Sequence, residues 1–144
     1  MTFFRKAYSV VGALLMLEYF AQFFFIAATI FTIVKADDNA KSVYAAFKNA
    51  GSFAGLHAIN GDLVISVTTL VLIAFALAAR LPRRTVLLTA LLFVLLLLQF
   101  ILANFPVAAV SALHGLNALV MVGLGGYLTG RNWAFRSTPA SETA

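Results

Sequence analysis

The only two histidines of the chain occur in the same short pattern. One copy reads Gly55-Leu-His57-Ala-Ile-Asn60-Gly61, and the other reads Ala112-Leu-His114-Gly-Leu-Asn117-Ala118. Both copies read small-Leu-His-small-aliphatic-Asn-small, and the histidines are 57 residues apart. Because imidazole is the commonest metal ligand among side chains, a repeated histidine predicts two equivalent donors for one metal centre.

The residues that follow each histidine suit a flat cofactor. Gly61 and Ala118 stand four positions on, which is one helical turn away on the same face, and they leave room for a macrocycle. Asn60 and Asn117 stand three positions on, where they can hydrogen-bond a neighbouring helix or a cofactor edge. We therefore expect these four residues to surround a bound cofactor.

Haem b with His57 and His114 as its two axial ligands is the leading hypothesis for this motif pair. A mononuclear zinc or copper site has less support, because two histidines without thiolates or a nearby carboxylate leave its coordination incomplete. The structural alternative is interhelical hydrogen bonding, worth on average about 0.6 kcal/mol per side chain in a membrane. Ionisable residues inside a membrane favour the functional interpretation.

The motifs belong to a very apolar chain. Of its 144 residues, 62% are hydrophobic and 10% are charged, against roughly 45–50% and about 25% in globular proteins. With a mean hydropathy of +0.98, much of the chain must be dissolved in lipid, which excludes a cytosolic enzyme, a secreted disulfide scaffold and a nucleic-acid-binding module. The absence of cysteine excludes thiol catalysis and zinc–thiolate sites.

Four stretches reach the length of about 20 apolar residues that a membrane helix needs. The predicted spans are residues 9–34, 51–79, 85–103 and 106–129. Short links between them predict an all-α, integral membrane, antiparallel four-helix bundle. Since the motifs fall in the second and fourth spans, and Gln22-Phe23 and Gln99-Phe100 echo each other in the first and third, the chain is predicted to be a duplicated helical hairpin with its second and fourth helices diagonally opposed.

Charge predicts the orientation. One side receives Arg5, Lys6, Arg80, Arg83, Arg84, Arg131 and Arg136, and the other receives Lys35, Lys41 and Lys48. The positive-inside rule then places both termini in the cytoplasm of a cell-membrane protein, and both histidines toward the outer leaflet. Residues 40–49 have helical apolar spacing and are predicted as a connecting helix at the outer interface or an extension of the second span. The tail, 137–144, is predicted to be disordered.

Two carboxylates fall inside the predicted spans without a cationic partner. Glu18 and Asp62 each cost about 2.5–3.5 kcal/mol near a helix centre, so they are either protonated or next to a wet cavity. Gln22 shares the helix face of Glu18. Asp62 lies five residues past His57 and is expected to point away from the metal face. Interhelical hydrogen bonding is favoured over proton handling for both.

A histidine on the second and fourth helices of a four-helix membrane unit resembles one half of the haem A synthase family. The chain is also similar to small four-span proteins of the actinobacterial type with a His-x-x-Asn/Gly pattern. The resemblance implies haem ligation by His57 and His114, as in the cofactor-binding half. The catalytic half has Glu-x-x-His, whereas Ala54 precedes His57 here, and Ala58 stands where that family has arginine. Methyl oxidation of haem is therefore not implied.

Two functions from different classes follow from these residues. The first is a single-haem membrane protein that works near the outer leaflet in electron transfer or haem handling, with Lys35, Lys41 or Lys48 as partners of the haem propionates. The second is a cofactor-free accessory subunit or small transporter with a polar intramembrane core. No catalytic motif is present, so the sequence leaves enzymatic activity open. The expected partners are the lipid bilayer and either a second copy, which would rebuild a two-unit arrangement, or a larger membrane complex.

Overall fold

The computed structural model describes residues 2–39 and 42–135, which are helical throughout apart from short connections. The elements are α1 (Thr2–Asp38), α2 (Val43–Ile59), the π-helical turn η1 (Asn60–Ile65), α3 (Ser66–Ala78), α4 (Arg83–Ala103), α5 (Ala108–Ser111) and α6 (Leu113–Arg131). Because α2, η1 and α3 follow one another without a break, they form a single long helix.

Four helices of the described chain are long and apolar enough to cross a membrane. They are α1, the helix built from α2, η1 and α3, then α4, and finally α5 with α6. The prediction of four spans in a multi-pass membrane protein is confirmed at this level. The residues described within them include Arg5 and Lys6 at one end of α1 and Lys35 at the other.

The first two helices are longer than the sequence predicted. Helix α1 continues through Lys35 to Asp38, and α2 begins at Val43, where the Ser42 hydroxyl caps it by accepting a hydrogen bond from the Ala45 backbone N–H. The stretch after residue 42 is thus an extension of the second span. Charges and Asx residues alone do not break a helix, because Lys, Ala and Asp all cost less than glycine or proline there.

The other connections follow the expected breaks more closely. Arg80 adopts a positive φ of 49° in the turn after α3, and Pro82 stands immediately before α4. In the last connection α5 begins at Ala108, two residues after Pro106, and α6 ends at Arg131. The predicted start of the fourth span at residue 106 is therefore two residues early.

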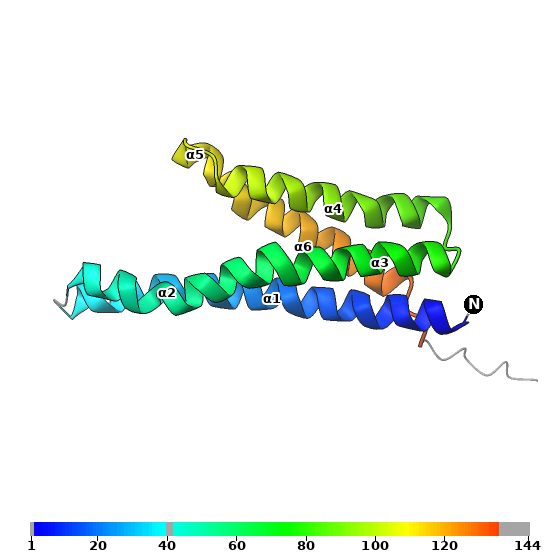
Figure 1. Cartoon of the computed structure of the whole chain (residues 1–144), viewed down its shortest axis with the longest axis horizontal. Coiled ribbons are helices and arrows are strands. Elements are labelled where there is room, and N and C mark those ends of the chain that lie inside the picture. Colours follow the sequence, from blue (N-terminus) through cyan, green and yellow to red (C-terminus); the bar gives the residue numbers. More distant parts are fainter. Residues whose placement is uncertain (1, 40–41, 136–144) are drawn as a thin grey trace, which may run out of the picture.

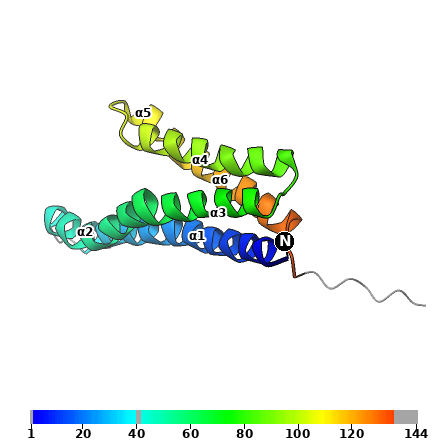
Figure 2. The same ribbon diagram turned by 45° about the vertical axis from the view of Figure 1, so that its right-hand side comes forward.

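The four long helices share one core. Helix α1 packs against α2, α3 and α6, and α4 packs against α3 and α6, so the first and third spans each contact both the second and the fourth. The N-terminus, the α3–α4 turn and the end of α6 lie at one end of the molecule (Figure 1). Toward the opposite end, where α2 and α5 lie, the two hairpins diverge (Figure 2).

The buried faces of α1 and α4 show the duplication directly. Tyr8, Gly12, Leu15 and Tyr19 of α1 are buried, and so are the residues 77 positions later in α4. These are Thr85, Thr89, Leu92 and Leu96. The hydroxyls of Tyr8 and Thr89 are hydrogen-bonded to each other at 2.9 Å, so the two copies meet in the core through equivalent faces.

Candidate functional site

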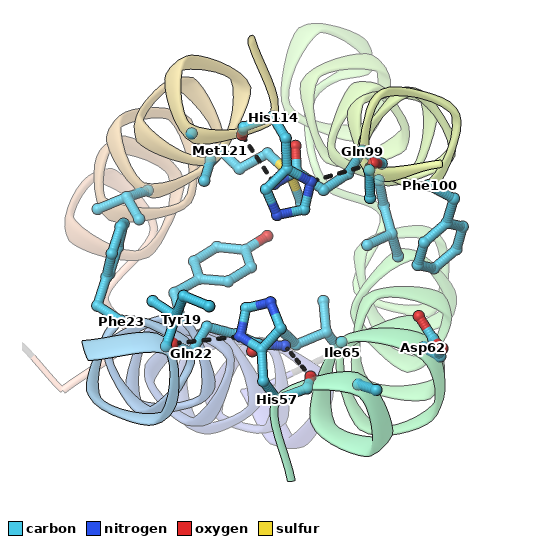
Figure 3. Close-up of a pocket in the computed structure, with 18 of the residues that line it drawn as sticks. Tyr19, Gln22, Phe23, His57, Asp62, Ile65, Gln99, Phe100, His114 and Met121 are labelled. Atoms are coloured by element: carbon cyan, nitrogen blue, oxygen red, sulfur yellow. Dashed lines mark hydrogen bonds between the residues drawn. The ribbon is translucent and has the colours of Figure 1, made fainter. Parts of the chain in front are cut away.

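The two histidines face each other across the interior. His57 lies near the end of α2 and His114 in the first turn of α6, and their ring centres are 6.3 Å apart with the ring planes inclined at 56°. Both side chains are partly buried. Residues 57 positions apart in the chain are thus brought together at one end of the molecule (Figure 3).

Backbone carbonyls determine which nitrogen of each ring is free. The Nδ1 atom of His57 lies 3.3 Å from the Gln22 carbonyl oxygen, and that of His114 lies 3.2 Å from the Gln99 carbonyl oxygen. Because a carbonyl oxygen can only accept, each Nδ1 carries the proton, and each Nε2 keeps its lone pair. Figure 3 shows these second nitrogens pointing toward the opposite ring.

The glutamines also hold the histidine backbones. The Gln22 side-chain amide donates to the His57 carbonyl oxygen at 3.0 Å, and the Gln99 amide donates to the His114 carbonyl oxygen at 2.9 Å. Each glutamine and histidine therefore make two reciprocal hydrogen bonds. We call these two pairs the Gln–His clasps. The sequence indicated the glutamines only as a weak echo between the first and third spans.

The asparagines bind neighbouring helices. The Asn60 amide donates to the Glu18 carbonyl oxygen at 3.1 Å, and the Asn117 amide donates to the Leu95 carbonyl oxygen at 2.9 Å and to the Gln99 side-chain oxygen. Of the two roles predicted for these residues, the structure shows the contact with a neighbouring helix. Neither asparagine lines the cavity beside the histidines, so a contact with a cofactor edge stays a prediction.

A cavity of about 440 Å³ adjoins both imidazoles. Its volume falls in the range of roughly 300–1,000 Å³ that is usual for ligand and cofactor sites. Gly61 and Ala118 line it, as the sequence predicted. Gly61 is also a point of close approach, because a Cβ there would lie 2.7 Å from the Gln22 amide nitrogen. Most of the remaining lining is apolar, with Phe23 and Phe100 from equivalent positions of α1 and α4.

Tyr19 is a site residue that sequence reasoning missed. Its side chain is only 4% exposed, and its hydroxyl has no hydrogen-bond partner among the described residues. In Figure 3 this hydroxyl is directed into the space between the histidines. The equivalent residue of α4 is Leu96, so Tyr19 has no counterpart in the second copy. A buried hydroxyl without a partner indicates a polar atom on whatever occupies the cavity.

The two intramembrane carboxylates lie in different surroundings. Glu18 accepts a hydrogen bond of 2.8 Å from the Thr68 hydroxyl of α3, and its other carboxylate oxygen is buried without a partner among the described residues. Interhelical hydrogen bonding by Glu18 is thus as expected. Asp62, in η1, is exposed and lines the cavity, but Figure 3 shows it turned away from both imidazoles.

The chain itself offers a metal ion few ligands at this site. In the part of the chain that the structure describes, no group of three or more histidine, aspartate or glutamate side chains is placed to share a metal ion. Two imidazoles alone would leave a zinc or copper ion short of ligands. A metal that already has four equatorial nitrogens needs two more donors, which is what His57 and His114 supply.

The geometry defines a multi-pass helical membrane protein with an inward-facing histidine pair. A family of unknown function, DUF6220, matches residues 44–109. This stretch includes His57, Asn60 and Gln99, but not Gln22 or His114. No curated protein and no solved structure matches the chain.

Proposed function

We propose that the protein binds one haem b in the cell membrane through His57 and His114, and that it serves electron transfer or haem handling near the outer leaflet. In this proposal the chain is an antiparallel four-helix bundle with both termini in the cytoplasm. The observation that carries the proposal is the pair of imidazoles whose unprotonated Nε2 atoms point toward each other.

The separation of the rings suits two ligands of one metal. A metal–nitrogen bond is about 2 Å long, and bond lengths of about 1.3 Å place a ring nitrogen about 1.1 Å from the centre of the imidazole. Two such donors on opposite sides of one metal therefore bring the ring centres to about 6 Å. The observed distance is 6.3 Å. Ligating histidines usually donate their other nitrogen to a carbonyl or carboxylate, as both do here.

The surroundings support a macrocycle better than a bare ion. The cavity is bordered by both histidines, by the small residues Gly61 and Ala118, and by aromatic rings from α1 and α4. The resemblance to the cofactor-binding half of haem A synthases supports the same ligand pair. Lys35 and Lys48 lie at the outer end, and in this proposal they face the haem propionates. Lys41 falls outside the described residues.

The experiment is an absorbance spectrum of the detergent-purified protein, produced with ample haem, before and after reduction with dithionite. We expect a Soret band and sharp reduced bands that are lost in both His57→Ala and His114→Ala. Asn104→Ala is the matched control, because Asn104 also lines the cavity but bonds only to the Phe100 carbonyl oxygen. That variant should keep the wild-type spectrum.

A colourless wild-type protein, with haem present during expression, would overturn the proposal. A spectrum that survives both histidine substitutions would also overturn it. Either result would favour the cofactor-free accessory subunit or transporter, in which the same polar residues only hold helices together.

A further inference from the structure

We infer that Glu18 takes up a proton when the bound haem is reduced, so that electron uptake and proton uptake are coupled in this protein. This inference rests on the proposed haem site and adds a function to it. The polar turn of α1 that contains Glu18 has no equivalent in the second hairpin, where Leu95 and Leu96 stand in place of Glu18 and Tyr19. The coupling would therefore involve a single carboxylate for the one haem.

The position of Glu18 places it next to the histidine site without contact with either ligand. Glu18 lies four residues before Gln22 on α1, about 6 Å along the helix axis, and Gln22 forms a clasp with His57. The Asn60 amide binds the backbone carbonyl of Glu18. The carboxylate is thus one helical turn away from the clasp, on the side nearer the N-terminal end.

The carboxylate has room in its bonding for a proton. One oxygen accepts the hydrogen bond from Thr68, and the other is buried with no partner among the described residues. An ionised carboxylate with an unsatisfied buried oxygen is costly in a membrane. A proton on that oxygen, or a positive charge nearby, removes the cost.

No side-chain cation stands near Glu18 to supply that charge. The titratable groups on the elements packed around it are Tyr19 of α1, His57 of α2, Asp62 of η1 and His114 of α6, and α3 contributes none. The described arginines and lysines lie toward the helix ends. Ferric iron in a dianionic macrocycle with two neutral imidazoles carries one net positive charge, so the haem itself is the available counter-charge.

Reduction then changes the balance at Glu18. One electron from an external donor converts iron(III) to iron(II), and the net positive charge of the haem core disappears. Over such short distances, charges interact more strongly in the membrane interior than in water. The carboxylate loses its stabilisation and takes up one proton from solvent, which forms an O–H bond on Glu18. The sum is one electron and one proton taken up together.

The test is the haem midpoint potential of the holoprotein, measured by redox titration at several pH values with spectroscopic detection. Coupling predicts that the potential falls as pH rises, by up to about 59 mV per pH unit for one proton per electron. In Glu18→Gln, which can still accept the Thr68 hydrogen bond, the potential should be independent of pH. In Asp62→Asn, the matched carboxylate control, the pH dependence should remain.

A reduced-minus-oxidised infrared spectrum of the wild type gives a second measurement that needs no folded variant. A carbonyl band of a protonated carboxylic acid should appear on reduction. A wild-type potential that does not change with pH, or a slope that Glu18→Gln retains and Asp62→Asn abolishes, would overturn the inference and leave the haem site standing. A protein that binds no haem would overturn both proposals.

Discussion

Two backbone carbonyl oxygens, those of Gln22 and Gln99, determine the chemistry of the histidine pair. A helical carbonyl has a second lone pair beyond its intrahelical bond, and here that lone pair accepts the Nδ1 proton of an imidazole. The same glutamines donate through their side chains to the histidine backbones. Tautomer and ring position are therefore fixed together, and both Nε2 atoms are left as donors to the cavity.

The Gln22–His57 clasp should be sensitive to a single methyl group. In Gly61→Ala the new Cβ would lie 2.7 Å from the Gln22 amide nitrogen, so the glutamine must move and its hydrogen bond to His57 is lost. We expect the protein to lose about 1 kcal/mol of stability and to retain less haem. Gly115→Ala is the control, because nothing lies within 4 Å of a Cβ there. Equal unfolding midpoints and haem contents for the two variants would contradict the role given to the clasp.

At this scale the sequence predicted the residues that occur in both copies. His57, His114 and the two asparagines were found because their patterns repeat, and the glutamines because they echo each other. Tyr19 could not be found in this way, since its counterpart is Leu96. The partners of the asparagines depend on the register between adjacent helices, which is a tertiary property that one sequence does not contain.

The element that most distinguishes the two hairpins is the π-helical turn η1. In the second hairpin the buried face runs from Asn117 to Met121, a step of four residues. In the first hairpin the corresponding step runs from Asn60 to Ile65, a step of five. The turn thus contains one extra residue, and the spacing between equivalent buried positions falls from 57 to 56, as between Thr69 and Gly125. Single π-turns of this kind often occur at functional sites.

This interpretation predicts different outcomes for two single-residue deletions. Deleting Leu63, which is 61% exposed within η1, should convert the turn to regular α-helix and leave the buried face of α3 in place. Deleting Leu70, which is 50% exposed within α3, should rotate the following residues by about 100° and expose Leu72 and Ala76. Size-exclusion chromatography in detergent should then show a wild-type peak for the first variant and aggregate for the second. The reverse pattern would contradict the extra-residue account.

The outer part of the first hairpin was the least predictable element. Gln22 and Gln99 are 77 residues apart but the histidines only 57, so the first hairpin has 20 more residues between glutamine and histidine than the second. The structure forms these residues mainly as continuations of α1 and α2. The sequence marked a break from Lys35 to Asn39 on charge and turn residues. The actual end of α1 is set by the pairing of the two long helices, which local composition does not reveal.

On the scale of the whole molecule, the duplication places the cavity and the charged ends. Arg5, Lys6, Arg80, Arg83, Arg84 and Arg131 belong to the end that holds the N-terminus, the α3–α4 turn and the end of α6, while Lys35 and Lys48 belong to the opposite end. Arg136 and the tail at 137–144 lie outside the described residues. The four spans were predictable because apolar run length sets them, whereas the divergence of the two hairpins was not.

The proposed orientation can be tested with single cysteines, because the chain has none of its own. Ala45→Cys near the start of α2 and Thr2→Cys at the start of α1 are both at exposed positions. If the arginine-rich end is cytoplasmic, a membrane-impermeant maleimide should label Ala45→Cys in intact cells. Thr2→Cys should react only after the cells are permeabilised. Labelling of Thr2→Cys alone in intact cells would contradict the orientation and move the histidine site to the inner leaflet.

The most direct measurement on the central claim is an electron paramagnetic resonance spectrum of the oxidised wild-type protein, with haem and protein quantified in the same sample. Two imidazole ligands on one ferric haem predict a low-spin, six-coordinate signal and one haem per chain. His57→Ala or His114→Ala should remove that signal. A high-spin signal in the wild type, or no haem at all, would contradict the assignment of His57 and His114 as a ligand pair.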